Sequence, residues 1–418
     1  MKDFSFVHTA DLHLDSPFSG LRQVDGEVAA LLKDATFKAF DQVVDLALSN
    51  KVDFLLVAGD VYDSSERSLR AQLRFADGLK KLADAGIRSF VCHGNHDPMD
   101  GWSASLQWPN EVHVFGPQLE SVSLALGGGN VVRIHGVSYP HSRIDESFGK
   151  GFEREGSEPF QVGLFHCSVG SDPAHETYAP RTLEELVAAD LDYWALGHVH
   201  SHKVLKNSHP LIAYPGTPQG RHIRELGPRG CLLVRVNGNR EVSVRFEPVD
   251  AARWFSHELR IDDLETEGEL VEALERLCEK TRNEARERVA ILRVTLSGRG
   301  HLHSALRRPQ VVEGLTDRSR EIGLESAPPV WIERVLVNTR TAIDLDSRRQ
   351  SADFLGEVLR IIESSRREPE QLHELISQLY EDRRGRSFLE ASTESDLLGV
   401  LDEVESLCLD ELVQEESS

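Results

Sequence analysis

The sequence predicts an α/β protein that continues into a smaller α+β domain and a helical C-terminal region. Within the first hundred residues, a β-type run, an acid-rich turn and a helix-type segment follow one another three times. This order is typical of βαβ units, which form a largely parallel sheet with functional loops at the carboxyl ends of its strands. Residues 254–340 then mix strand-type and helix-type segments, and the chain is helix-type from Ser351 onward.

The composition indicates a globular protein with enough residues for two or three domains. The chain has 418 residues, of which 40% are hydrophobic. Because it lacks an apolar run of about 18 residues and begins with a short polar segment, we expect neither a membrane span nor a signal peptide, and a cytoplasmic location. The five cysteines are far apart and include no Cys-x-x-Cys pair, so we expect reduced packing residues.

The formal net charge of −22 does not decide whether the partner carries phosphates. Residues 341–418 hold 20 acidic and 8 basic residues, a balance of −12, so just under half of the excess belongs to the rest of the chain. Carboxylates that bind divalent cations also count as negative in this tally, although the bound ion reverses their field.

The first β-type run, Phe4 to Thr9, leads into Ala10-Asp11-Leu12-His13. Asp11 and His13 are two residues apart, so on an extended backbone both side chains leave the same face. This is a spacing that suits metal ligands.

Two further strands end in similar turns. A helix-type segment, Val28 to Leu48, is followed by the strand Val52 to Ala58, which ends at Gly59-Asp60. A second helix, Ser68 to Ala85, leads to the strand Ile87 to Cys92.

The third strand breaks at Gly94-Asn95-His96-Asp97. Gly94 gives the backbone freedom to turn sharply, and an amide, an imidazole and a carboxylate follow within three residues. A hydrogen-bonded structural turn could use the same residue types. The matching turns after the other strands favour a functional interpretation.

Histidines also follow two later strands of the first domain. His166 comes after Val162 to Phe165, and His198 and His200 come after Tyr193 to Leu196. The other elements that we expect here are a hairpin with a glycine-rich turn, a short helix, a strand and a second hairpin, at residues 119–137, 182–189, 211–214 and 231–246.

We expect domains at residues 1–249, 250–340 and 341–418. The second would contain a helix from Glu269 to Glu287 and strands at Val289 to Leu296 and Trp331 to Asn338, with a loop between these strands. The third has an apolar stripe among ten acidic residues, which fits either a helix folded back on its own core or a docking helix for a partner. The stripe consists of Leu397, Leu401, Val404 and Leu412.

Carboxylate, imidazole and amide groups at the strand ends predict a metal centre. This mixture suits Mn²⁺, Fe²⁺ or Zn²⁺ better than an all-oxygen Ca²⁺ or Mg²⁺ site. Seven ligands are too many for one tetrahedral ion but suffice for two ions if one carboxylate, most simply Asp60, bridges them. The seven expected ligands are Asp11, His13, Asp60, Asn95, His166, His198 and His200.

Two ions about 3.5 to 4 Å apart lower the pKa of a shared water and hold a phosphoryl group for in-line attack. We therefore predict hydrolysis of a phosphoester. His96 is not needed as a ligand, so it would stabilise the leaving oxygen or the developing charge, oriented by Asp97. We interpret His8, His93 and His135 as surface or core residues.

From Phe4 to about Pro248, these turns resemble the calcineurin-like metallophosphoesterase superfamily. Within it, the chain is most similar to DNA double-strand-break repair nucleases of the bacterial SbcD and YhaO types. The likeness to the YhaO type rests on residues 8–18, 192–200 and 215–230. The resemblance implies a β-sandwich core flanked by helices, a capping domain at 250–340 that helps to admit DNA, and two ions, of which Mn²⁺ is the first expectation.

The resemblance also implies how the ligands divide. One ion would take Asp11, His13, Asp60 and His200, and the other would take Asp60, Asn95, His166 and His198. His96 would be catalytic. Asp63 departs from the archaeal and eukaryotic nucleases, which carry a second catalytic histidine at this position.

The resemblance further implies a homodimer whose C-terminal helices dock on the coiled-coil root of an SMC-like ATPase of the SbcC or YhaN type. Together these observations predict a two-metal DNA exo- or endonuclease of DNA repair that uses a metal-activated water. Two alternatives stay open, namely a phosphodiesterase of nucleotides or other small phosphoesters, and a DNA-end-binding scaffold with weak catalysis. Arg221, His222 and Arg224 fit a nucleic-acid backbone and any other phosphate equally well.

Overall fold

The computed structural model describes residues 1–21, 26–63, 67–129, 131–144, 148–156, 158–170, 178–342, 345–367 and 394–416. The chain divides into two compact units. The first comprises Met1–Ser256, Cys278–Arg293 and Ile322–Glu333, and the second comprises His257–Leu277, Val294–Glu321 and Arg334–Ser418. Boundaries between these two units fall within all three strands of a small sheet, at residues 252–260, 289–300 and 330–341, and they do not coincide with the three expected domains. The expected domain boundaries therefore stay a prediction.

The first unit contains two six-stranded mixed sheets. The first sheet has the order β12-β11-β1-β2-β3-β4. Strands β1 to β4 are parallel to one another, and β11 is antiparallel to both of its neighbours, β1 and β12. The sheet consists of β1 (Phe4–Thr9), β2 (Phe54–Ala58), β3 (Arg88–Cys92), β4 (Val112–Val114), β11 (Gly230–Val236) and β12 (Val242–Pro248).

The second sheet has the order β5-β6-β7-β8-β10-β9, with parallel central strands and antiparallel edges. The expectation of parallel strands is therefore correct for β1 to β4 of the first sheet and for the centre of the second, but not for the β12-β11-β1 side of the first sheet or for the edges of the second. This sheet consists of β5 (Glu120–Ala125), β6 (Val131–Gly136), β7 (Phe160–His166), β8 (Tyr193–Gly197), β9 (Lys203–Asn207) and β10 (Leu211–Tyr214). A short 3₁₀ helix, Gly127–Gly129, lies between β5 and β6, and Asn130 of the expected turn lies outside the described residues.

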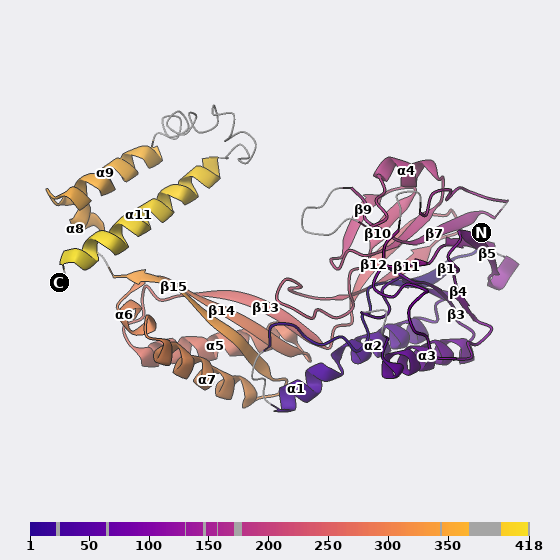
Figure 1. The fold of residues 1–418 in the computed structure, drawn as a ribbon, viewed down its shortest axis with the longest axis horizontal. Coiled ribbons are helices and arrows are strands. Elements are labelled where there is room, and N and C mark those ends of the chain that lie inside the picture. The colour runs from indigo at the N-terminus through magenta and orange to yellow at the C-terminus, as the bar shows by residue number, and fades with distance from the viewer. Residues whose placement is uncertain are drawn as a thin grey trace. The chain divides into compact units, whose positions relative to one another are not determined.

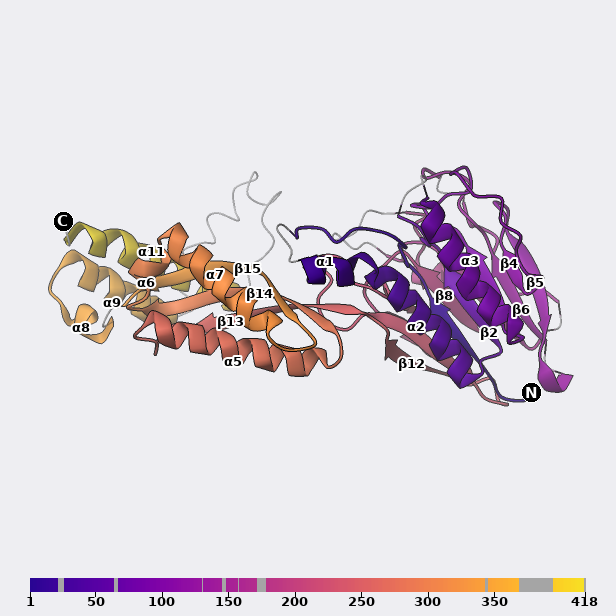
Figure 2. The same cartoon turned by 90° about the horizontal axis from the view of Figure 1, so that it is seen from below.

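The two sheets pack face to face, and helices cover their outer faces (Figure 1). Residues alternate along β2: Phe54 and Leu56 point into the core between the sheets, whereas Leu55 and Val57 contact the helix layer. Helices α2 (Ala35–Asn50) and α3 (Leu69–Asp84) cover the first sheet, side by side in Figures 1 and 2, and α4 (Leu183–Ala188) covers the second. The result is a β-sandwich flanked by helices, as expected.

Two helix boundaries have local causes. The helix expected from Val28 to Leu48 is broken, because Asp34 leaves helical geometry at φ −103° and ψ 4° and so separates α1 (Gly26–Lys33) from α2. Helix α3 begins where expected, since the Ser68 side chain accepts a hydrogen bond from the backbone N–H of Ala71 and so caps the helix.

A three-stranded sheet with the order β13-β14-β15 follows the sandwich strands in sequence. Its strands are β13 (Ala252–Arg260), β14 (Val289–Gly300) and β15 (Val330–Thr341), and α5 (Glu267–Ala285) connects the first two. The segment expected as a loop contains α6 (His303–Leu306) and α7 (Pro309–Leu324). Helix α7 was not predicted from the sequence, because only a few of its positions are buried, including Leu315, Ser319 and Ile322. Strands β4 and β9 are short and were also not expected.

The described C-terminal helices are α8 (Leu345–Gln350), α9 (Phe354–Arg367) and α11 (Glu394–Glu416). Helices α9 and α11 are held together by buried Leu359, Ile362 and Leu401. Arg366 of α9 also donates hydrogen bonds to Asp402 and Glu405 of α11. Of the expected apolar stripe, Leu397 and Leu401 are buried, Val404 is exposed, and the side chain of Leu412 lies outside the described residues, as do residues 368–393.

The structure answers two smaller expectations. No helix among the described residues is long and apolar enough to cross a membrane. All five cysteines are free, which confirms that they do not form a disulfide framework.

Candidate metal centre

The carboxyl ends of strands from both sheets meet at one edge of the sandwich. The loops after β1 and β2 are joined by hydrogen bonds from the backbone N–H groups of Asp11 and His13 to the carbonyls of Gly59 and Asp60, both 3.0 Å long. His166 ends β7 of the second sheet, and its Nδ1 lies 2.9 Å from the Ala58 carbonyl at the end of β2. The predicted ligands lie around this junction, as do His96 and Asp97.

One cluster combines Asp11, His13 and His200. Their ligand atoms lie within 4.8 Å of one another. The Nε2 atoms of His13 and His200 face each other at 3.1 Å. Two Nε2 atoms at this separation can both coordinate one cation, since a metal–imidazole bond is about 2.0 to 2.1 Å long.

The second cluster combines Asp11, Asp60 and His166, again within 4.8 Å. Nε2 of His166 lies 3.3 Å from Oδ2 of Asp60 and 3.0 Å from Oδ1 of Asn95. Asp60 also approaches the first cluster, at 3.9 Å from Nε2 of His13. The Asp11 and Asp60 carboxylates thus lie between the imidazoles of the first cluster and that of the second. We expected Asp60 alone to be shared between two ions, but Asp11 also belongs to both clusters.

His198 occupies a different position from the other predicted ligands. Its backbone N–H donates to both carboxylate oxygens of Asp11, at 3.1 Å each. Its ring packs edge-on against the His166 ring, with centroids 5.3 Å apart. Within the described residues, its ring nitrogens belong to neither cluster, so its role as a ligand stays a prediction.

The backbone at this junction is strained. Asp11, His13, Asp60 and His198 all have positive φ angles, of 53°, 43°, 51° and 102°. Non-glycine residues adopt this region rarely and at an energetic cost, and such residues cluster at functional sites. The surrounding hydrogen bonds hold these four side chains in directions that a relaxed backbone would not give them.

Glycines allow the two sheets to approach closely here. A Cβ atom on Gly94 would lie 2.2 Å from Oδ1 of Asp60 and 2.8 Å from Nε2 of His166, and one on Gly197 would lie 1.7 Å from the Ala58 carbonyl oxygen. Gly94 is not among the glycines with positive φ. Space for the site, rather than the freedom to turn sharply, therefore requires glycine at position 94.

The charges of the site fit a divalent cation. Burial raises the pKa of Asp11 to about 6. Burial also favours a raised pKa for Asp60, but the neighbouring His166 holds it below its ordinary value. Burial lowers the pKa of His13 to about 3, which favours the neutral imidazole that metal ligation requires, whereas at His166 burial is outweighed by the Asp60 carboxylate, which raises the pKa to about 9. A cation would stabilise both buried carboxylates at once.

The structure corrects one expected contact. The Asp97 carboxylate does not orient His96; it accepts hydrogen bonds from the backbone N–H groups of Val61 and Gly94, at 3.0 and 2.7 Å, and lies 3.0 Å from Nδ1 of His93. The His96 ring instead has its Nδ1 3.0 Å from the Asp63 carbonyl oxygen. Asp97 therefore shapes the turn that carries Asn95 and His96, because a carboxylate with two oxygens can hold two separate backbone amides.

Three residues that are not among the predicted ligands border the first cluster. Asp63 and Glu225 lie beside His13 and His200, and Arg221 contacts Asp63. Arg221 was expected to bind phosphate, but its guanidinium faces Asp63 and Ser16. In the sequence, Glu225 beside Arg221 and Arg224 could have indicated a residue that supports the metal ligands. Its spacing alone, however, does not show that it contacts His200.

The histidines interpreted as structural have partners in the fold. Buried His8 contacts the Tyr193 hydroxyl and the Leu196 carbonyl, and His135 contacts Gln161.

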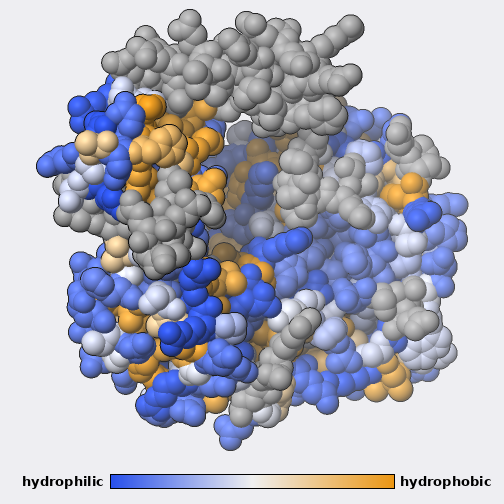
Figure 3. All heavy atoms as spheres, turned by 60° about the vertical axis from the view of Figure 1, so that its left-hand side comes forward, coloured by the Kyte–Doolittle hydropathy of each residue, from blue (hydrophilic) through white to orange (hydrophobic). Residues whose placement is uncertain are grey.

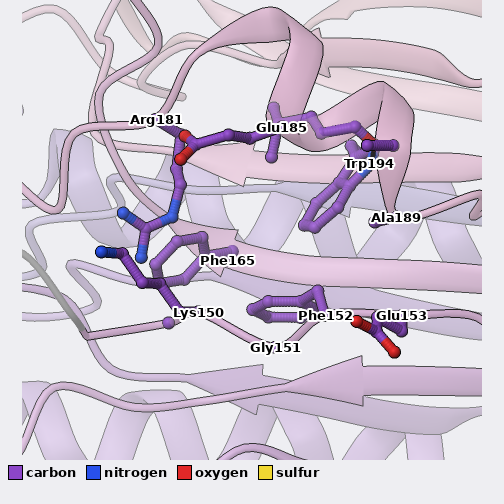
Figure 4. Close-up of a pocket in the computed structure, with 12 residues that line it drawn as sticks. Lys150, Gly151, Phe152, Glu153, Phe165, Arg181, Glu185, Ala189 and Trp194 are labelled. Atoms are coloured by element: carbon purple, nitrogen blue, oxygen red, sulfur yellow. Dashed lines mark hydrogen bonds between the residues drawn. The ribbon is translucent and has the colours of Figure 1, made fainter.

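A separate cavity of about 250 Å³ lies beneath α4. Figure 4 shows the rings of Phe152, Phe165 and Trp194 in its wall, with the Arg181 side chain beside Phe165. The Trp194 Nε1–H donates to the Leu186 carbonyl, and Glu185 forms the capping box of α4. The cavity lining includes none of the predicted ligands, so we assign it to packing under α4.

Comparisons with known proteins agree with this geometry. Residues 4–202 match the calcineurin-like phosphoesterase family, and residues 254–340 match the middle domain of metallophosphoesterase YhaO. The uncharacterized metallophosphoesterase YhaO of Bacillus subtilis (strain 168) is 35% identical over 289 residues, which are 69% of this chain and 70% of that protein.

Two further relatives are more distantly similar. The SbcD component of the nuclease SbcCD of Bacillus subtilis is 24% identical over 257 residues, which are 53% of this chain and 63% of that protein. The DNA double-strand break repair protein Mre11 of Aeropyrum pernix is 25% identical over 278 residues, which are 61% of this chain and 63% of that protein.

All seven predicted ligands fall within residues 4–202, the part of the chain that matches the phosphoesterase family. The similarity to YhaO extends beyond this part and covers more than two thirds of both chains. The chain therefore belongs to the calcineurin-like phosphoesterase family of metal-dependent hydrolases.

Proposed function

We propose that this protein is a two-metal-dependent DNA phosphodiesterase, an exo- or endonuclease that acts in DNA repair in the cytoplasm. The observation that carries the proposal is the pair of clusters that share Asp11, with Asp60 between their imidazoles. Similarity to the SbcD component of the nuclease SbcCD and to the repair protein Mre11 supports DNA as the substrate.

The residues take the following roles in this proposal. The ligands of the two ions are Asp11, His13, Asp60, Asn95, His166, His198 and His200, and Mn²⁺ is the expected metal. When bound, the ions supply an activated water and hold the phosphoryl group. His96 stabilises the developing charge or the leaving oxygen; its side chain is 46% exposed and can reach a substrate. Asp97 supports catalysis by holding the turn.

The first test is degradation of linear double-stranded DNA by the purified full-length protein in Mn²⁺. A His198→Ala protein and a chromogenic phosphodiester serve as comparisons. We expect the wild-type protein to cut DNA and the variant to lose this activity. If only the small diester is hydrolysed, the DNA proposal is contradicted for the isolated chain, and the alternative of a small-phosphoester hydrolase takes its place. If DNA is bound but neither substrate is cut, the scaffold alternative holds.

For its partner, we propose an SMC-like ATPase whose coiled coil packs on α9 and α11. Both helices carry exposed apolar residues in addition to their shared core, namely Phe354, Ile361, Val400, Val404 and Leu407, which are 40 to 72% exposed. Val400, Val404 and Leu407 share one face of α11, at spacings of four and three residues. Figure 3 shows hydrophobic patches on the face of the molecule that it presents. An apolar helix face is the kind of surface that packs on another helix.

Replacing Val400 and Leu407 by serine should weaken capture of the co-expressed ATPase at least about tenfold, since each buried aliphatic side chain contributes about 1.5 to 3 kcal/mol. The matched control replaces Leu336 and Val337, which are exposed on β15, by serine. Mn²⁺ content should stay unchanged in both proteins. Equal retention of the ATPase by the two variants would contradict this docking surface.

We also propose a homodimer. Leu69 and Leu73 on α3 are exposed, as are Met99, Trp102 and Trp108 in the segment after β3. This segment lies near α3, because Ala104 N–H donates to Gln72 and the Trp108 ring packs on Phe75. Exposed apolar side chains gathered in this way favour association. Light scattering that gives the mass of a single chain would contradict the dimer.

A further inference from the structure

Two histidines of the first cluster each have a carboxylate at the ring nitrogen that points away from the cluster. Nδ1 of His13 lies 2.9 Å from Oδ1 of Asp63, and Nδ1 of His200 lies 2.6 Å from Oε1 of Glu225. A carboxylate at Nδ1 favours the tautomer that carries the proton there, which leaves the Nε2 lone pair for a metal. The Nε2 atoms of both rings face the cluster and lie 3.1 Å from each other.

Arg221 contacts both of these carboxylates. Its Nη1 lies 2.9 Å from Oδ1 of Asp63 and 2.8 Å from Oγ of Ser16. Its backbone N–H donates to Oε2 of Glu225 at 2.6 Å. The Arg221 side chain is only 11% exposed, so it is held in this position rather than free in solvent.

We propose that Arg221 is a positioning residue that holds Asp63 and Glu225 against His13 and His200, and so prepares one of the two metal positions before an ion binds. This inference rests on the proposed metal ligands and adds three residues that act through them. The guanidinium fixes Asp63, whereas the Arg221 backbone fixes Glu225.

The second cluster is oriented differently. Nδ1 of His166 lies against the neutral Ala58 carbonyl, and its Nε2 lies near Asn95 and Asp60. The Arg221 guanidinium contacts Ser16 and Asp63, which belong to the surroundings of the first cluster. Loss of the guanidinium should therefore weaken one metal position and leave the other nearly unchanged.

A positioning role and a purely electrostatic role predict opposite results. The guanidinium is a positive charge near a cation site, so removing it would strengthen Mn²⁺ binding if charge alone mattered. Removing it would weaken binding if the orientation of Asp63 and His13 mattered more. Loss of an outer-shell partner typically costs about 10 to 100-fold in metal affinity.

The experiment titrates the full-length protein with Mn²⁺ alone and follows free Mn²⁺ by electron paramagnetic resonance. Arg221→Gln removes the guanidinium and keeps the backbone N–H that donates a hydrogen bond to Glu225. Arg133→Gln is the matched control, because Arg133 also joins two carboxylates, Glu155 and Glu158, neither of which adjoins a proposed ligand in sequence. We expect two ions per wild-type chain, and in Arg221→Gln an affinity at least about tenfold lower at one position only.

Asp63→Asn provides a second variant that preserves side-chain size, in case Arg221→Gln does not fold. It should weaken the same position, and the double variant should be no weaker than the more affected single variant, since both changes act through one contact. Unchanged or tighter Mn²⁺ binding in folded Arg221→Gln or Asp63→Asn would overturn the inference while the two-metal centre stands. A wild-type protein that binds no Mn²⁺ would overturn both the inference and the proposed function.

Discussion

Replacing Asp60 by asparagine is expected to lower hydrolysis of a phosphodiester at least about a thousandfold, which corresponds to about 4 kcal/mol in the activation free energy. The Asp60 carboxylate lies between the imidazoles of His13 and His166 and accepts a hydrogen bond from the His96 backbone N–H. Asparagine has the same shape but no negative charge. Both metal positions should therefore lose affinity, because the proposed bridging carboxylate would contribute to each of them.

The control for this variant is Asp190→Asn. Asp190 also has a positive φ, of 54°, and its side chain is 71% exposed, so the substitution makes the same chemical change on a similar backbone away from the site. The measurements are Mn²⁺ content, the rate with a chromogenic diester, and the melting temperature without metal. If Asp60→Asn keeps more than about a tenth of the wild-type rate, Asp60 does not bridge two catalytic ions.

Replacing His96 by alanine is expected to lower the rate about a hundred to ten thousandfold and to leave Mn²⁺ binding unchanged. The contact of His96 with the proposed ligand Asp60 is made by the His96 backbone N–H, which alanine keeps. The ring itself lies edge-on to the His13 ring, with centroids 5.2 Å apart, and is half exposed. The variant should therefore lose the group that faces substrate while the ligands stay in place.

His141→Ala is the matched control, since His141 is 68% exposed and paired with Asp100. Rates and Mn²⁺ titrations of the two variants would be compared at saturating metal. A His96→Ala protein that cuts DNA as well as His141→Ala would show that His96 is not catalytic. A His96→Ala protein with one ion fewer would instead make His96 a ligand.

Much of the fold follows from local patterns. Buried strands such as Phe54–Ala58 appear as continuous apolar runs, since they are covered on both faces, and the end of this strand is marked by Gly59 and Asp60. Helix α7 was not predicted, because its burial depends on neighbours that are distant in sequence. The edge strand β9 was not predicted, because none of its residues is buried and its sequence therefore carries little apolar signal. In α7, few apolar residues suffice for packing, so the periodic signal is weak.

The sequence by itself determined the chemistry of the site, because Asp, Asn and His recur directly after β-type runs, and the carboxyl ends of parallel strands meet at one edge of a sheet. The tertiary structure decided which of these groups are neighbours. It brought Asp63 to His13, Glu225 to His200 and Arg221 to both carboxylates, and it turned Asp97 away from His96. Contacts of this kind depend on how two sheets pack and on strained backbone angles, neither of which is encoded in the spacing of residues along one strand.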